Sequence, residues 1–245
     1  MNTLIKLEIL RQLRNRRFLF FSVIYPSVLY LLLAGSSGNA ALPGMRIDAA
    51  LYFMVTMAAF GAMTAVLLGN SERIAKERDR GWIRQLRLTP LPGRGYVIAK
   101  IAAAASVSLP SILLVLVVAA TVKHVHLEAW QWAAIAACTW AGSFVFAALG
   151  VAIGYLVSGD SARPVTMIIY FGLALLGGLW MPLTFLPDWA VDAAQWLPTR
   201  AYTALGQAVE VGDAPPVKDA CLLAGYLVAF VAAAAWLYRR DTRTS

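Results

Sequence analysis

Long uncharged apolar runs, separated by polar segments, constrain this chain more than any other feature. The longest polar segment lies between Gly69 and Val97, and an apolar run precedes and follows it. About 20 apolar residues suffice to cross about 30 Å of hydrocarbon as a helix. Because a backbone inside lipid must satisfy its own hydrogen bonds, such runs in series predict a bundle of membrane helices.

Composition supports a single membrane domain. The chain has 245 residues, of which 60% are apolar and 14% charged, whereas soluble domains are about 45–50% apolar and about 25% charged. We expect one transmembrane domain over residues 1–245 and no second, soluble domain. The net charge is +8, but the basic residues flank the apolar runs, so we expect them to set topology and expect no nucleic-acid partner.

The pattern predicts an all-α membrane protein with six transmembrane helices. The predicted spans are residues 18–36, 49–69, 97–122, 130–157, 165–186 and 220–238. An amphipathic helix is expected within the first 17 residues, with Ile5, Ile9 and Leu13 on its apolar face, lying at the membrane interface in contact with lipid. The first 17 residues are not expected to be a cleaved signal, because no small-residue cleavage site follows.

The distribution of Lys and Arg predicts the orientation. Seventeen of these residues lie in the terminal segments, in the segment after the second span together with the foot of the third, and in the segment after the fourth span, whereas four lie on the opposite side. Because cytoplasmic segments carry the excess of positive charge, both termini are expected in the cytoplasm. An even number of spans agrees with that orientation.

The external segment from Pro182 to Pro216 is too long for a simple turn and is rich in aromatic residues and proline. Asp188 and Thr199 are suited to cap short helices. We expect two short helices that re-enter the outer surface between the fifth and sixth spans. An ordinary interfacial belt of aromatic residues is the alternative.

Several kinds of chemistry are absent from the sequence. Within the six predicted spans the one ionisable Lys, Arg, Asp or Glu residue is Lys100, so a proton relay at membrane depth is not expected. The sequence has no G-x-x-x-x-G-K-[ST] phosphate loop and no nucleophile–base constellation. His124 and His126 are interpreted as interfacial rather than as metal ligands. We therefore predict no catalytic residues, no metal and no cofactor in this chain, and an energy source in another polypeptide.

The polar segment after the second span has the properties of a docking element. Ser71 is a candidate helix N-cap, Gly81 is expected to interrupt the helix, and Trp82 and Leu86 give a second short helix an apolar patch. Such a basic, partly apolar hairpin suits a groove on a soluble partner, with its apolar residues as anchors. A solvated loop that only satisfies the positive-inside rule is the alternative.

Two motifs resemble the type-2 ABC exporter permeases, a family of drug, lipid and polysaccharide exporters. The first is Glu77-Arg78-x-x-Gly81 followed by Leu86 and Thr89-Pro90-Leu91. The second runs from Trp180-Met181-Pro182 through Leu186-Pro187-x-Trp189 to Leu197-Pro198-Thr199. One departure is Arg84, which stands where many relatives have an acidic residue.

The resemblance implies a mechanism and a set of partners. Two six-span subunits, either a homodimer or this chain with a paralogous permease, would lie in a bacterial inner membrane above two copies of a separate ATPase that binds ATP and Mg. A coupling helix near 77–86 would transmit closure of the ATPase. The residues expected to couple the chain to the ATPase are Glu77, Arg78, Gly81, Trp82, Leu86 and Pro90.

Residues of the second and fifth spans are candidates for the substrate pathway. Methionine and aromatic side chains make adaptable apolar surfaces that suit amphiphilic cargo. Ordinary helix–helix packing is the alternative. The candidate residues are Thr56, Met57, Phe60, Thr64, Thr166, Tyr170 and Trp180.

The leading interpretation is the permease subunit of an ABC exporter that moves a drug-like or lipid amphiphile outward. Export of a lipid-linked polysaccharide is an alternative within the same family. From other classes, a non-ABC membrane enzyme or assembly factor would need intramembrane catalytic residues, and a channel would need a polar pore ring. The sequence does not select the substrate.

Overall fold

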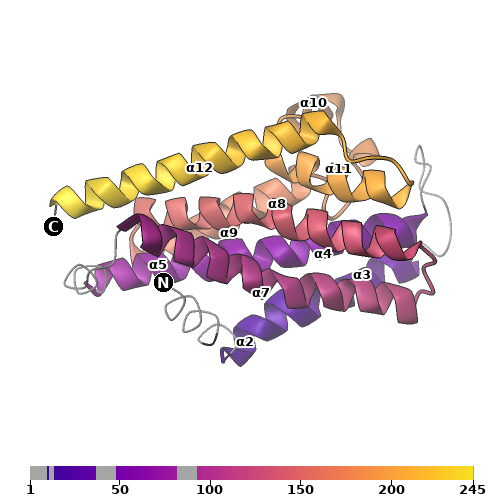
Figure 1. Ribbon diagram of the computed structural model, residues 1–245, viewed down its shortest axis with the longest axis horizontal. Helices are drawn as coiled ribbons and strands as arrows, with labels where there is room; N and C mark the ends of the chain where they lie inside the picture. The colour runs from indigo at the N-terminus through magenta and orange to yellow at the C-terminus, as the bar shows by residue number, and fades with distance from the viewer. Residues whose placement is uncertain (1–9, 11–13, 37–47, 82–92, 245) are drawn as a thin grey trace.

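The computed structural model describes the backbone of residue 10 and of residues 14–36, 48–81 and 93–244, and each regular element within these ranges is a helix. Figure 1 shows the long helices lying side by side as one bundle. The predicted all-α class is therefore confirmed. The candidates Trp82, Leu86 and Pro90 and the first nine residues of the expected interfacial helix lie outside the described residues.

The first helical stretch combines α2 (Arg16–Leu19), the π-helix η1 (Phe20–Ile24) and α3 (Tyr25–Ser36). Asn15 Oδ1 accepts the backbone N–H of Phe18 at its start. Pro26 lies just after the π-helix, where its missing N–H removes one helical hydrogen bond. In the same stretch the hydroxyl of Ser22 donates to the carbonyl oxygen of Phe18, one turn earlier.

The centre of the bundle is one continuous helix of 31 residues, formed by α4 (Ala49–Met63), the π-helix η2 (Thr64–Leu68) and α5 (Gly69–Asp79). In the most apolar stretch of 18 residues in this helix, 89% is buried inside the chain. The predicted span ended at residue 69, but the helix continues for ten residues because helix-forming side chains follow. Ser71 is therefore in the helix interior and is not an N-cap. The helix ends just before Gly81, whose φ is 70°.

Three further helices surround this centre: α7 (Gly93–Thr121), α8 (Ala129–Leu156) and α9 (Gly159–Leu176). α8 approaches the central helix closely, since a Cβ on Gly150 would lie 3.1 Å from the carbonyl oxygen of Leu67. α9 ends ten residues before the predicted end of the fifth span. Gly178, with a φ of 73°, turns the chain there, and a short 3-10 helix, η3 (Leu183–Phe185), follows.

The predicted external segment contains two short helices, α10 (Asp188–Ala194) and α11 (Pro198–Glu210), before the last helix, α12 (Val217–Thr244). In Figure 1, α10 and α11 lie at the end of the bundle opposite the end of α5 and the C-terminus. α11 is largely buried against α8, α12 and α4. These helices occupy the predicted place, and their re-entry into a membrane stays a prediction.

Four described helices are long and apolar enough to cross a membrane: Ala49–Asp79, Ile98–Thr121, Ala129–Leu156 and Val217–Asp241. A shorter apolar helix covers Phe20–Gly35. The described part of the chain thus supports a membrane protein, and the count of six spans stays a prediction.

Candidate functional site

The site with the most contacts between helices lies at the end of α5. Three consecutive charged residues, Glu77, Arg78 and Asp79, close this helix. Consecutive residues of an α-helix point about 100° apart, so each of the three side chains reaches a different neighbouring helix. We call the short connection between α8 and α9, residues 157–159, the α8–α9 junction.

Glu77 forms a buried ion pair with α7. Its Oε2 accepts a hydrogen bond from Lys100 Nζ at 2.7 Å, and Arg73 Nε lies 3.8 Å from its other carboxylate oxygen. The Lys100 side chain is 1% exposed and that of Glu77 is 7% exposed. Removing one member of such a pair leaves a buried charge without its partner, which costs several kcal/mol. The pair therefore fixes α5 against α7.

Arg78 binds the end of α8. Its guanidinium donates to the carbonyl oxygens of Tyr155 and Val157, the latter at 2.9 Å. The last carbonyls of a helix have no partner within the helix and lie at the negative end of its dipole, so a cation is well placed there. Arg78 Nε also lies 3.8 Å from Asp241 Oδ1 of α12.

Asp79 caps the start of α9. Its Oδ2 accepts the backbone N–H of Gly159 at 2.6 Å, and an unpaired N–H at a helix start is the usual partner of such a carboxylate. Arg78 and Asp79 thus hold the α8–α9 junction from both sides. A displacement of the end of α5 must either move this junction or break these charge-assisted hydrogen bonds.

Two hydrogen bonds continue this connection deeper into the bundle. The hydroxyl of Thr166 on α9 donates to Ser71 Oγ at 2.8 Å. Thr64 Oγ1 and the hydroxyl of Tyr170 are 2.5 Å apart. All four side chains are buried, and polar groups without access to water bind one another strongly. The central helix and α9 are therefore joined along about three turns.

Four of the candidate pathway residues come together in this region. The Phe60 ring lies 5.3 Å from that of Tyr170 and 5.6 Å from that of Trp180, and Thr64 bonds to Tyr170. Thr166 instead meets Ser71. The other two, Thr56 and Met57, are fully buried, and Thr56 Oγ1 donates to the carbonyl of Tyr52 within its own helix. These contacts pack helices together within one chain, and a role in a pathway stays a prediction.

Three of the six residues expected to couple the chain to an ATPase, Glu77, Arg78 and Gly81, lie within the described residues. Glu77 and Arg78 face other helices of the same chain, and Gly81 has no atom within 4 Å of an ideal Cβ. Both Glu77 and Arg78 therefore join helices inside the bundle. Their role toward a partner stays a prediction.

Sequence reasoning passed over Lys100, Asp79 and Ser71 as site residues. Lys100 carried a visible signal, since it is the single charge in an apolar run. Its partner could be found only by extending α5 as far as Glu77, which places a carboxylate opposite the start of α7. The role of Asp79 was not visible in the sequence, because its partner Gly159 is 80 residues away.

Comparison with known proteins places the chain in a family. The model of the family described as ABC-2 family transporter protein matches residues 42–237. The chain is 29% identical over 234 residues to YvfS of Bacillus subtilis (strain 168), which is provisionally named a transport permease. The match covers 96% of this chain and 95% of that protein. Together with the helical bundle and its apolar spans, the extent of the family match shows that this chain belongs to the ABC-2 transporter family.

Proposed function

We propose that this chain is the membrane-spanning permease subunit of an ATP-binding cassette exporter that moves an amphiphile outward. A separate ATPase binds ATP and Mg and supplies the energy, and this chain contributes no catalytic group. Family membership supports the permease role. The observation that carries the mechanism is the contact between the end of α5 and the α8–α9 junction, through Arg78 and Asp79.

Coupling begins in the segment that follows α5. Trp82, Leu86 and Pro90 contact the ATPase, and closure of the ATPase displaces the end of α5 near Gly81. Because Glu77 and Arg78 join α5 to α7 and α8, the displacement reaches the spans. Such coupling is effective only when ATP and substrate favour different conformations of the whole complex.

The chain crosses a bacterial inner membrane six times, with both termini in the cytoplasm. The contacts of Glu77, Arg78 and Asp79 support this topology, because they bring the ends of α5, α8 and α12 and the starts of α7 and α9 to one end of the bundle. That end carries most of the basic residues. The helices α10 and α11 then lie at the outer surface.

Two permease chains, identical or paralogous, complete the pathway. α9 supports this pairing because it leaves an apolar face uncovered: Ile168 is 75% exposed, and Phe171 and Leu175 are also exposed. Gly172 on this helix has no neighbour within 4 Å of an ideal Cβ, which permits close approach of another helix. The amphiphile moves along the boundary between the copies, near Tyr170 and Trp180.

The experiment compares ATP hydrolysis by the ATPase purified with this chain, by the ATPase alone and by the chain alone. We expect hydrolysis that depends on the ATPase and changes when the chain is present. Trp82→Ala is expected to weaken the complex by at least tenfold, since a desolvated aromatic anchor contributes about 2 kcal/mol or more. Trp189→Ala, which removes an exposed tryptophan of α10, is the matched control. Hydrolysis by the chain alone, or equal effects of the two variants, would contradict the proposal.

A further inference from the structure

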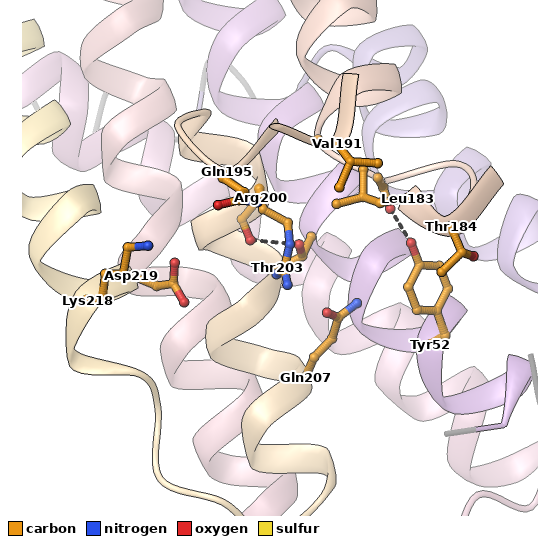
Figure 2. Close-up of a pocket in the computed structure, with 12 residues that line it drawn as sticks. Tyr52, Leu183, Thr184, Val191, Gln195, Arg200, Thr203, Gln207, Lys218 and Asp219 are labelled. Atoms are coloured by element: carbon orange, nitrogen blue, oxygen red, sulfur yellow. Dashed lines mark hydrogen bonds between the residues drawn. The ribbon is translucent and has the colours of Figure 1, made fainter. Parts of the chain in front are cut away.

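A cavity of about 470 Å³ lies at the end of the bundle where α10 and α11 are found. It is lined by residues from the start of α4, the turn after α9, η3, α10 and the residue that follows it, α11 and the start of α12. Figure 2 shows Arg200 at its centre, with Lys218 and Asp219 on one side and Tyr52 and Thr184 on the other. The lining combines charged and amide side chains with the apolar Leu183 and Val191, which is the mixture that binds an amphiphilic group.

Arg200 contributes to this cavity a buried polar atom that lacks a partner. Its Nη1 is buried and has no hydrogen-bond partner, and among the described residues no ion pair engages its guanidinium. A guanidinium presents five donors in a planar fork, which matches a phosphate or carboxylate better than any other group. Leaving a buried donor of this kind unmatched costs free energy that a bound anion would recover.

The charges around Arg200 leave the cavity positive. Lys218 and Asp219 line the same cavity, and their charges cancel. Asp188 and Asp192 of α10 are exposed and do not line the cavity. Glu210 is the last residue of α11, and both of its carboxylate oxygens are buried without a partner. Burial raises the pKa of Glu210 well above its usual range, because a buried carboxylate loses the solvation of its charge. Burial thus disfavours the charged form of Glu210 that would neutralise Arg200.

Exposed aromatic side chains lie on the same elements that line the cavity. Trp189 and Trp196 are each 69% exposed, and Phe185 is 56% exposed. Phe185 belongs to η3 and follows the lining residue Thr184, Trp189 belongs to α10, and Trp196 follows the lining residue Gln195. Tryptophan concentrates where headgroups meet hydrocarbon. A cationic cavity on elements that also carry such rings fits a ligand that has an anionic head and an apolar body.

We propose that this cavity binds the anionic phosphate or carboxylate headgroup of an amphiphile, with Arg200 as its principal ligand. Gln195 and Gln207, which also line the cavity, add neutral donors for the same oxygens. This proposal rests on the proposed export function in one respect: it takes the bound amphiphile to be the exported substrate. The substrate would then have an anionic headgroup. Binding itself requires no ATPase and is tested without one.

The test uses the full chain purified in a non-ionic detergent, with bound lipid measured by native mass spectrometry. The probes are phosphatidylglycerol, diacylglycerol with the same acyl chains, and inorganic phosphate as competitor. We expect the wild-type chain to bind phosphatidylglycerol at least tenfold more tightly than diacylglycerol, which has no anionic headgroup, since hydrogen bonds to a charged group contribute that much. Inorganic phosphate at equal concentration should not displace the lipid. Equal binding of the two lipids would overturn the proposal, and displacement by phosphate would show a free anion as the ligand.

Two variants assign the effect to the cavity. Arg200→Gln should lower phosphatidylglycerol binding by about tenfold or more. Lys123→Gln removes a positive charge from the connection between α7 and α8, outside the cavity, and should leave binding unchanged. Equal losses in both variants would contradict a specific role for Arg200. No ATPase is present in this test, so its result does not depend on whether the chain is an exporter. The headgroup site and the export function can therefore be refuted independently.

Discussion

The charged residues at the two ends of this bundle differ in whether their side chains have partners. At the end of α5, Glu77, Arg78 and Asp79 each bind a group on another helix, at 2.7 Å for Glu77 and 2.6 Å for Asp79. At the end that holds α10 and α11, Arg200 Nη1 and both carboxylate oxygens of Glu210 are buried without a partner. The charged side chains at the α5 end join helices of the bundle to one another. At the α10–α11 end, buried donors and acceptors remain without hydrogen-bond partners.

This difference indicates two different tasks. Paired charges in a water-poor site resist separation, so the helices they join move together. Unpaired buried groups raise the free energy of the state that contains them, and a ligand or a conformational change that satisfies them is favoured. The α5 end is thus suited to transmit movement, and the α10–α11 end is suited to bind and release.

Breaking the buried pair at the α5 end is expected to have the largest effect. Lys100→Met should lower the free energy of unfolding by about 3–5 kcal/mol, because it leaves the Glu77 carboxylate buried without its main partner. Thermal unfolding of the detergent-solubilised chain measures the loss. The double variant Glu77→Gln/Lys100→Met should recover most of it. A single variant as stable as the wild type would show that the pair does not hold α5 against α7.

Removing the cap of α9 is expected to have a smaller effect. Asp79→Ala should cost about 1 kcal/mol of stability, as the loss of an N-cap usually does, and should weaken coupling between ATP hydrolysis and transport. Asp160→Ala is the matched control, since Asp160 lies in the first turn of the same helix and is exposed. If the two variants behaved alike, the hydrogen bond from Gly159 would have no special role.

At the end of the bundle that holds α10 and α11, a substitution is expected to raise the stability of the chain. Glu210→Gln is expected to raise the apparent Tm by about 2–4 °C at neutral pH, the shift that about 1 kcal/mol produces in a chain of this size. The folded pKa of Glu210 is raised by burial, so above the ordinary pKa of Glu the folded state binds more protons than the unfolded state, and stability is lost as pH rises. The wild type should therefore become more stable as pH falls toward 4.5, the ordinary pKa of Glu, and the difference from the variant should disappear there. A variant less stable than the wild type at neutral pH would contradict a Glu210 pKa that burial raises.

The helices of this fold were predictable from the sequence, and several of their ends were not. Apolar runs mark membrane helices because the backbone must satisfy itself in lipid. Hydropathy does not mark the end of the central helix, which continues through charged helix formers to Asp79. Nor does it mark the end of α9, where the turn at Gly178 interrupts an apolar run that continues to residue 186.

The candidate site was predictable in its residue types but not in its partners. Glu77 and Arg78 were found through a motif, and the motif indicated an outward-facing role. Their inward contacts depend on tertiary structure, because Tyr155 and Val157 are 77 and 79 residues from Arg78. Arg200 gave no signal in the sequence, since its lack of a partner can be seen only in the folded chain.

The most direct test of the account is a distance measurement between the ends of α5 and α9 in the complex with the ATPase. Spin labels are placed at Arg80 and Ser161, both exposed, after Cys138 and Cys221 are replaced by serine. Labelled chain is diluted with unlabelled chain so that the distance within one copy is observed. A second sample, labelled only at Arg80 in every copy, reports movement between copies.

The account predicts that the distance between copies changes when ATP is trapped. The distance from residue 80 to residue 161 should keep the same mean and width, because Arg78 and Asp79 hold the α8–α9 junction to α5. A shift or broadening of the 80–161 distance under the same conditions would contradict the account, because α5 would then move without α8 and α9.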